Sequence, residues 1–252
     1  MKKNGSFADK DLLLEPFRYT IRKRYENFVL REVGFTEGKK RLADVFNSHL
    51  YYGLHKTDKA WVFREWAPFA TALYLIGDFS DWQKKEEYRL YKIENGNWEL
   101  DLPLDRLRHG MKYRLWVEWK GGEGERLPSH VRRAVQDEDT KQFSAEVWEP
   151  AKTYLWEHEF RHREKNPLIY ETHIGMSTEK LGVSTFEEFR QQVLPRIADL
   201  GYNTIQLMGI QEHPYYGSFG YQVSNFFAVS SRFGTPDDLK LSLIHISEPT
   251  RP

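Results

Sequence analysis

The opening part of the chain repeats apolar residues with the period of a helix. Between residues 12 and 33, apolar side chains recur at spacings of four, four and three, at Phe17, Ile21, Tyr25 and Phe28. This spacing predicts one apolar stripe along a helix, and Gly34 is expected to end that helix. A weaker helical pattern covers residues 41–46. The sequence therefore predicts a helical segment over residues 1–58.

The period changes to two between about residue 60 and residue 150. The runs that alternate apolar and polar side chains, as half-buried strands do, are residues 61–66, 71–76, 98–102 and 113–119. Turn signals rich in glycine, proline and asparagine separate them. Short strands at such regular spacing predict an antiparallel β-sandwich over residues 59–150.

A strand, a helix and a second strand follow in the next part of the chain. Residues 168–175 predict the first strand, and Ser184 with Glu187 predicts a capping box at the start of the helix. Pro195 lies inside the helical pattern, so a kink or restart is expected there. Residues 203–208 are mostly apolar and predict a strand buried on both faces. This βαβ order is typical of a parallel sheet or barrel.

The last part of the chain begins with a long segment, residues 209–235, which is predicted to be a loop at the carboxyl ends of the barrel strands. Thr235 at the N-cap and Pro236 at the first helical position predict a further helix. That helix is not expected to continue, and residues 241–252 are interpreted as a non-native tail. Residues 151–240 are therefore predicted to form a separate βαβ part of a parallel sheet or barrel.

Composition narrows the class of partner. The 37 basic and 37 acidic residues cancel, so neither nucleic acid nor an anionic membrane is an expected partner. No apolar run reaches the length of a transmembrane helix, and Asp9 and Asp11 interrupt any export signal. The absence of cysteine excludes disulfides and cysteine metal sites. A cytoplasmic location is expected.

The aromatic content, 15%, is the unusual feature of the composition. Aromatic rings offer flat apolar faces that match the C–H face of a sugar ring, so neutral sugars are one interpretation. Core packing is the other interpretation, and composition alone favours it.

Specific motifs carry a resemblance to a known family. Residues 65–68 (EWAP) and 77–82 (GDFSDW) resemble the family 48 carbohydrate-binding module, and residues 170–177 are similar to a first barrel strand. A third set resembles branching enzymes of glycoside hydrolase family 13: residues 193–208, 211–216, 218–222 and 231–236. The resemblance implies a multidomain fold with N-terminal helices, an immunoglobulin-like β-sandwich and the first βαβ part of a truncated TIM barrel.

The resemblance also implies a reaction. Branching enzymes cleave an α-1,4-glucan with retention and transfer the cut chain to a 6-hydroxyl group, which makes α-1,6 branches during glycogen biosynthesis. In that family the catalytic carboxylates follow the fourth, fifth and seventh barrel strands, so no residue of this chain is assigned a catalytic role. The chain itself is expected to be inactive. The implied partner is α-glucan, such as glycogen or amylose-like chains, without a cofactor or metal.

Candidate binding residues in the barrel part follow from the same resemblance. Tyr221 corresponds to a tyrosine that stacks under the glucose at the cleavage subsite, and Gln222 and His213 are weaker candidates for contacts with sugar hydroxyls. A tyrosine that merely packs the loop is the alternative for Tyr221. Glu212 is interpreted as a structural carboxylate that holds the loop by hydrogen bonds.

A second set of candidates lies on the predicted sandwich. In the resembling enzymes the corresponding positions border an oligosaccharide groove, at Glu37, Trp66, Pro68, Gly96 and Asn97. Core packing on a strand is the alternative for Trp66, and Trp82 has a similar ambiguity. Glu171 and His173 are interpreted as a polar pair in the barrel interior, and a lone pair of this kind indicates no metal site.

Alternative functions remain at this point. A non-catalytic α-glucan-binding protein would need only the sandwich, and the βαβ pattern after Leu168 argues against it. A debranching or trehalose-releasing hydrolase shares the modular plan, and the motif at residues 212–216 disfavours it. Two barrel strands with open edges also predict that residues from about 165 onward are loosely folded.

Overall fold

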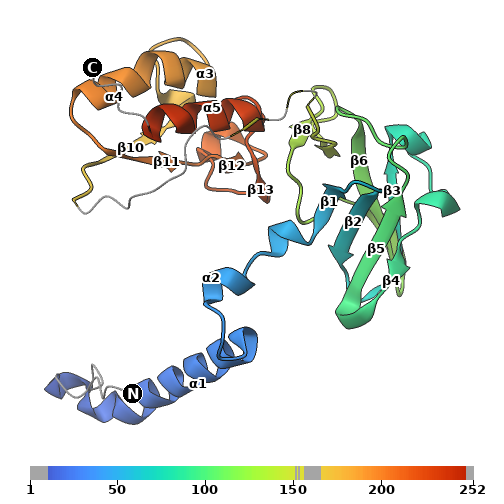
Figure 1. The fold of residues 1–252 in the computed structure, drawn as a ribbon, viewed down its shortest axis with the longest axis horizontal. Helices are drawn as coiled ribbons and strands as arrows, with labels where there is room; N and C mark the ends of the chain where they lie inside the picture. The colour runs from blue at the N-terminus through green and yellow to red at the C-terminus, as the bar shows by residue number, and fades with distance from the viewer. Residues whose placement is uncertain (1–10, 151, 153, 156–165, 248–252) are drawn as a thin grey trace. The chain divides into compact units, whose positions relative to one another are not determined.

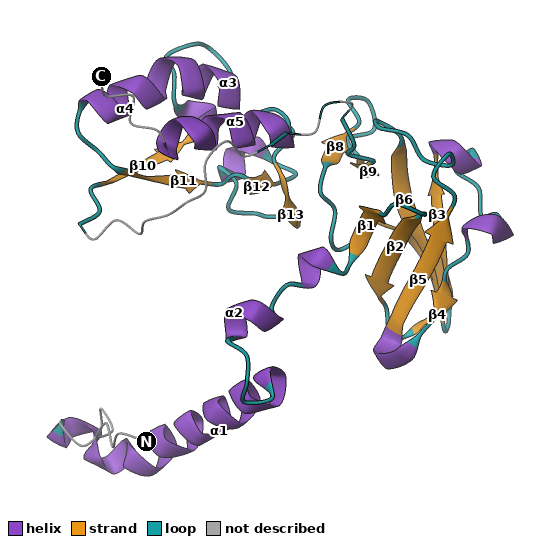
Figure 2. Cartoon of the chain, in the orientation of Figure 1, coloured by secondary structure: helices purple, strands orange, loops and turns teal. Residues whose placement is uncertain are grey.

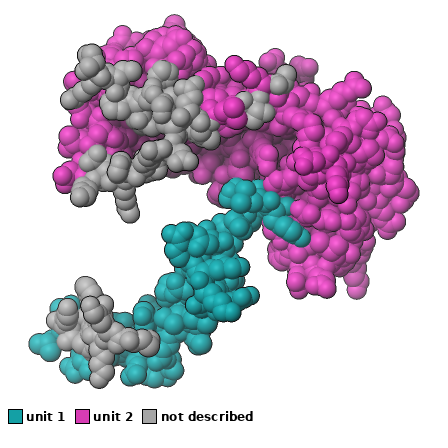
Figure 3. Space-filling view, in the orientation of Figure 1, with its two compact units in different colours: residues 1–51 teal, residues 52–252 magenta. Residues whose placement is uncertain are grey.

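The computed structural model describes residues 11–150, 152, 154–155 and 166–247. The chain divides into two compact units, residues 1–51 and residues 52–252 (Figure 3). Two predictions concern positions outside the described residues: the interruption of an export signal at Asp9, and the last five residues of the predicted tail.

The described part of the first unit is helical, as predicted, but the helical segment does not extend to residue 58, because Gly53–Lys56 form strand β1 of the sandwich. The elements of the first unit from residue 11 onward are a 3-10 helix, two α-helices and a second 3-10 helix, at Leu12–Phe17, Arg18–Thr36 (α1), Leu42–Val45 (α2) and Ser48–Leu50. The prediction that Gly34 ends the first helix is wrong, because α1 continues to Thr36. A single glycine costs an exposed helix only about 1 kcal/mol. Glu37, in a left-handed conformation with φ 54°, ends α1 instead.

The second unit begins with two antiparallel sheets (Figures 1 and 2). The first sheet has the order β1-β2-β5-β4, with strands Gly53–Lys56, Trp61–Trp66, Asn97–Leu102 and Tyr91–Lys92. The second has the order β3-β6-β9-β8, with strands Ala70–Gly77, Lys112–Trp119, Phe143–Glu146 and Ala134–Gln136. Strand β7, Gly122–Arg126, pairs with β6. All predicted strands of the sandwich are present.

The side chains between the sheets form a continuous apolar core. The fully buried members include Phe63 on β2 and Leu73 and Leu75 on β3, and Tyr88 and Leu90 on the connection to β4 pack with them. Alternate positions on the strands face this core because successive side chains of a strand point to opposite faces. This period-two pattern is the reason that the sequence alone predicted the sandwich.

The remaining described part is the predicted βαβ unit with a hairpin. Strand β10 pairs in parallel with β11, and β12 pairs antiparallel with β13. The elements in chain order are Ile169–His173 (β10), Phe186–Glu188 (α3), Leu194–Asp199 (α4), Thr204–Met208 (β11), Gln211–Glu212 (β12), Asn225–Val229 (β13) and Pro236–Ser247 (α5). A second apolar cluster, which includes Phe186, Phe189, Ile197 and Phe233, holds them together.

The helix between β10 and β11 departs from the prediction at its start. The capping box is formed by Thr185 and Glu188, whose side chains each accept a hydrogen bond from the other's backbone N–H, at 2.8 and 3.2 Å. Ser184 is buried and hydrogen-bonded to Thr178, at 2.6 Å between the hydroxyl oxygens. The prediction of Ser184 and Glu187 was therefore one residue early.

Pro195 has the predicted effect on this helix. The segment Phe189–Val193 is a π-helical turn, and a new α-helix begins at Leu194 with Pro195 in its first turn. Proline has no backbone N–H to donate to the preceding turn, so the helical hydrogen-bond pattern changes just before it.

Three further expectations about this region need correction. Strand β11 is not buried on both faces, because Gln206 is exposed and the rest of the strand is half-buried. The predicted loop of residues 209–235 contains the β12–β13 hairpin. The helix capped by Thr235 was predicted correctly at its start, where Asp238 accepts from the Thr235 backbone N–H at 2.8 Å, but it continues to Ser247.

Polar contacts join the sandwich to the hairpin within the second unit. Arg232 donates to the Gln136 side chain at 3.0 Å and to the Pro214 carbonyl at 2.9 Å. The His130 ring stacks on Phe227, with centroids 4.2 Å apart. The expectation that residues from about 165 are loosely folded stays a prediction, and these contacts argue against it. Within the described part of the chain, no helix has the length and apolar character needed to span a membrane.

Candidate functional site

Trp66 stands at the end of β2, directly opposite Asn97 on β5. Its indole N–H donates to the carbonyl of Asn95 at 3.1 Å, and its side chain is 57% exposed. The core-packing alternative for Trp66 is therefore wrong. The neighbouring Trp98 is the one that packs in the core, 4% exposed.

A tight turn holds the residues around Trp66 in place. Gly96 has φ +80°, and a Cβ there would lie 2.7 Å from the Cβ of Pro68. The backbone N–H of Ala67 donates to the Gly96 carbonyl at 2.9 Å. Only glycine allows this approach, since any side chain would collide with the proline. The turn thus fixes Pro68 beside Gly96 and leaves the indole of Trp66 facing solvent.

The structure brings together four of the predicted groove residues, Trp66, Pro68, Gly96 and Asn97. The Asn97 side chain accepts a hydrogen bond from the Tyr52 hydroxyl at 2.7 Å, so its amide is oriented. Their role in binding stays a prediction. Glu37, the fifth candidate, belongs to the other compact unit, where it is exposed at the end of α1.

Sequence reasoning did not single out Phe69 and Tyr52. Phe69 is 89% exposed just before β3, and Tyr52 orients Asn97. The continuation of the motif at residues 65–68 into an aromatic residue was the available signal for Phe69. No sequence signal linked Tyr52 to Asn97, because they are 45 residues apart.

Trp82 lies at a second surface site on the sandwich, above the sheet of β3 and β6. It has φ +59°, and its indole N–H donates to Asp78 at 3.1 Å. The guanidinium of Arg114 lies 5.8 Å from the centroid of the Trp82 ring. Because Trp82 is 36% exposed, it is partly open to solvent.

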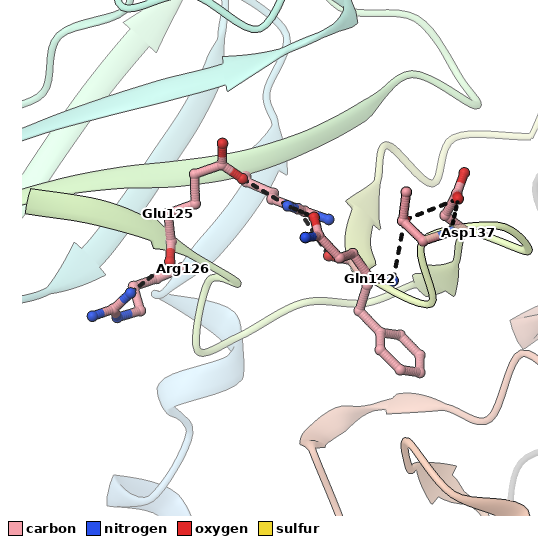
Figure 4. A network of polar contacts seen from close by, with 7 residues as sticks. Glu125, Arg126, Asp137 and Gln142 are labelled. Carbon is pink, nitrogen blue, oxygen red and sulfur yellow. Dashed lines mark hydrogen bonds and ion pairs between the residues drawn. The ribbon is translucent and has the colours of Figure 1, made fainter.

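A polar network that includes Glu125 and Gln142 (Figure 4) fixes the side chain of Arg114. Arg114 donates to Glu125 at 2.6 Å, to the Gln142 side chain at 2.7 Å and to the Phe143 carbonyl at 2.9 Å. These residues line a shallow depression of about 500 Å³. A guanidinium with three partners has little freedom left, so the charge is preorganised.

Tyr221 is placed on the surface by a close crossing of the backbone. Gly209 and Gly220 have φ +59° and +82°, and a Cβ on Gly220 would lie 2.4 Å from the Cα of Gly209. Beyond this crossing Tyr221 is 75% exposed, with its hydroxyl 3.6 Å from the sulfur of Met208. The alternative of a loop-packing tyrosine is therefore wrong. Gln222 is also exposed.

His213 does not share the surface position of Tyr221. Its side chain is fully buried, Nδ1 lies 2.9 Å from the Gln211 carbonyl, and the ring contacts Phe233. A direct contact of His213 with a sugar hydroxyl, as predicted, is incompatible with this burial. Burial follows from packing against a phenylalanine twenty residues later, which the local sequence does not show.

Glu212 is the structural carboxylate that the sequence predicted. It is fully buried and accepts hydrogen bonds from the backbone N–H groups of Ser231, at 2.7 Å, and His213, at 3.1 Å. The Ser230 hydroxyl lies 3.4 Å from the same carboxylate. Glu212 thereby ties the two ends of the hairpin together.

The predicted pair of Glu171 and His173 is not formed. Glu171 is exposed and accepts from the Gln206 side chain at 2.6 Å. His173 is buried, with Nε2 3.2 Å from the Phe219 carbonyl. Among the residues with described positions, no group of three His, Cys, Asp or Glu side chains could hold a metal ion.

His173 is expected to make the stability of this region depend on pH. Burial lowers the pKa of His173 below its usual value of 6.5, and the nearby His213 acts in the same direction. The unfolded chain therefore binds a proton at a higher pH than the folded chain. The contribution of neutral His173 to the stability of the folded state is complete above about pH 6.5. It is lost as the pH falls through the lower pKa of the folded state.

The measurement is hydrogen exchange of the β10 amides at pH 7.5 and at pH 5.5, corrected for intrinsic rates. His173→Gln is expected to show a smaller loss of protection on acidification than the unmodified chain. His49→Gln, at an exposed position, is the matched control and should leave the loss unchanged. An equal loss in all three proteins would contradict the role of His173.

A family model and solved structures show which class of protein this chain resembles. Residues 51–132 match the family model described as carbohydrate-binding module 48 (isoamylase N-terminal domain). A putative alpha amylase from Salmonella typhimurium has a similar fold, with a TM-score of 0.63 at 21% identity over 78% of this chain and 31% of that chain. For pullulanase from Bacillus acidopullulyticus the TM-score is 0.56 at 18% identity over 77% and 27%.

Sequence relatives then define the group more closely. The chain is 36% identical to a 1,4-alpha-glucan-branching enzyme from Dictyostelium discoideum over 91% of this chain and 35% of the relative. It is 38% identical to one from Rhizophagus irregularis, over 91% and 34%. The chain thus spans about a third of the length of the curated relatives it matches.

The resemblance read from the sequence is confirmed by these matches. The chain contains a family 48 carbohydrate-binding module and, over most of its length, is related to 1,4-alpha-glucan-branching enzymes. The predicted fold class is confirmed in its order of N-terminal helices, an immunoglobulin-like antiparallel sandwich and a βαβ unit, and its fold is that of the matched solved structures.

Proposed function

We propose that this chain belongs to a 1,4-α-glucan branching enzyme, in which it supplies the glucan-binding module and the first strands of the catalytic barrel. Such an enzyme cleaves an α-1,4-glucan and transfers the cut chain to a 6-hydroxyl group during glycogen biosynthesis. The observation that carries the proposal is the exposed indole of Trp66, held on a rigid turn of the family 48 module. The proposal includes a cytoplasmic location, since the cysteine-free sequence suits a reducing compartment.

The geometry around Trp66 suits a linear glucan. A flat indole packs against the apolar C–H face of a pyranose ring, while an amide such as that of Asn97 exchanges hydrogen bonds with sugar hydroxyls. The hydrogen bond from Trp66 to Asn95 fixes the indole before a ligand arrives. A platform fixed in advance loses little conformational entropy on binding, which favours affinity.

Tyr221 and Gln222 form the proposed sugar contact in the barrel part. The ring of Tyr221 stands exposed beyond the carboxyl end of β11, where ligands of parallel barrels bind. Its face is electron-rich and suits a sugar with developing positive charge. In this proposal the residues of this chain bind and orient glucan, and none of them breaks the glycosidic bond.

Trp66→Ala is expected to weaken binding of glycogen about tenfold, because the platform for the sugar face is removed. Affinity electrophoresis in gels with and without glycogen measures the effect as a loss of retardation. Trp119→Ala is the matched control, a half-buried indole elsewhere on the sandwich that stacks with Arg126. Equal retardation of the Trp66 variant and the unmodified chain would contradict the proposed groove.

A further inference from the structure

A cavity distinct from the residues above opens between the two sheets of the sandwich, beside strand β1. Its volume is about 550 Å³, within the range of pockets that hold small ligands. Residues of both sheets line it, including Trp61 from β2 and Tyr113 from β6. None of the candidate glucan-binding residues contributes to its lining.

The floor of the cavity is apolar and aromatic. Trp61 and Tyr113 are 4% and 3% exposed and belong to the core of the sandwich. The indole N–H of Trp61 donates to the Leu104 carbonyl at 3.3 Å, which fixes the ring. Burial raises the pKa of the Tyr113 hydroxyl, so this group keeps its proton and can donate a hydrogen bond. The rings supply a rigid surface that the core already orders.

The rim of the cavity carries oriented polar groups. Arg132 donates to Nδ1 of His55 at 2.9 Å, and because Nδ1 accepts, Nε2 carries the proton that is donated to the Tyr52 carbonyl at 2.8 Å. The guanidinium of Arg132 is exposed and has further N–H groups to donate. Opposite charges meet at Lys56 and Glu149, which form an ion pair.

The balance of charge at the rim selects the type of ligand. The positive side chains are Lys56 and Arg132, and the negative ones are Asp58, Glu146 and Glu149. An anion such as a phosphate would meet more carboxylates than cations, so it is disfavoured. A neutral polyhydroxylated ligand suits this mixture, because each hydroxyl group both donates to a carboxylate and accepts from a guanidinium.

We propose that this cavity is a second saccharide site of the module, which binds a short segment of neutral α-1,4-glucan between Arg132 and Glu146. The choice of glucan among neutral sugars rests on the proposed function. The rim groups exchange hydrogen bonds with the hydroxyls of the sugar, and the buried rings of Trp61 and Tyr113 form the base of the cavity beneath it. Two sites on one module increase its avidity for a long polymer without any additional contact at the Trp66 groove.

The indole N–H signals of the tryptophans make the two sites separately visible by NMR. Maltoheptaose titrated into the 252-residue chain is expected to shift the signals of Trp61 and Trp148, which line the cavity, as well as that of Trp66. Arg132→Gln and Glu146→Gln are expected to raise the dissociation constant read from the cavity signals about tenfold. The constant read from Trp66 should stay the same.

Arg106→Gln is the matched control, because Arg106 is exposed, pairs with Glu87 and does not line the cavity. Shifts of Trp66 with unchanged Trp61 and Trp148 signals would overturn the cavity proposal and leave the proposed function standing. Shifts at none of the three would overturn both. A stronger response of Trp61 and Trp148 to inorganic phosphate than to maltoheptaose would overturn the assignment of a neutral ligand.

Discussion

Glu212→Ala is expected to lower the free energy that protects the β12–β13 hairpin from opening by about 3 kcal/mol, which accelerates amide exchange there about 100-fold. The Glu212 carboxylate is fully buried and accepts from the backbone N–H groups of His213 and Ser231. Alanine leaves both donors buried without an acceptor and leaves a cavity in place of the carboxylate. Unsatisfied buried donors and cavities are among the most destabilising changes known.

Native-state hydrogen exchange is the suitable measurement for Glu212, because no tryptophan lies between residues 166 and 247 to report on this region by fluorescence. Glu171→Ala is the matched control, since that carboxylate is exposed on β10 and accepts a hydrogen bond from the Gln206 side chain on the neighbouring strand β11, away from the hairpin. It should change exchange of the hairpin little. Equal effects of the two variants would show that Glu212 does not hold the hairpin.

Gly220→Ala is expected to disrupt the backbone crossing that presents Tyr221. A Cβ on Gly220 would lie 2.4 Å from the Cα and 2.5 Å from the carbonyl oxygen of Gly209, with backbone on both sides of the contact. Backbone atoms cannot move aside as a flexible side chain does. The left-handed φ of +82° adds strain for alanine, and together these effects are expected to cost about 3 kcal/mol or more.

Gly201→Ala separates the two causes of this cost. Gly201 has φ +87°, close to that of Gly220, but no atom lies within 4 Å of the position of its Cβ. Its substitution is expected to cost about 1 kcal/mol, which measures backbone strain alone. Hydrogen exchange of the β11 and β13 amides gives both values. If Gly201→Ala and Gly220→Ala had equal effects, the close crossing would not determine the position of Tyr221.

The sandwich and the βαβ unit were predictable because their signals are local. Strands with one buried face alternate apolar and polar side chains, and the run at residues 61–66 became β2 with the predicted bounds. The start of α5 was predictable for the same reason. The side chains of Thr235 and Asp238 each accept a hydrogen bond from the other's backbone N–H within one turn. Such contacts depend on neighbours that the sequence shows directly.

The helix cap was predicted at the wrong residue because two neighbouring residues fit the same sequence pattern. A serine or threonine followed three residues later by glutamate describes a capping box, and both Ser184 and Thr185 satisfy that pattern. The hydrogen bond of Ser184 to Thr178 occupies the serine hydroxyl and leaves the cap to Thr185. That choice depends on how the preceding loop folds, which no local pattern reports.

The sequence by itself determined the resemblance to branching enzymes, the order of the main elements and the residues of the candidate groove. Only the tertiary structure decided which aromatic side chains face solvent. Trp66 and Trp98 both lie on strands of the same sheet, yet Trp66 is exposed and Trp98 is buried. Exposure depends on the turn at Gly96, and the burial of His213 depends on Phe233. Such contacts form between residues far apart in the chain, so they exist only once the chain has folded.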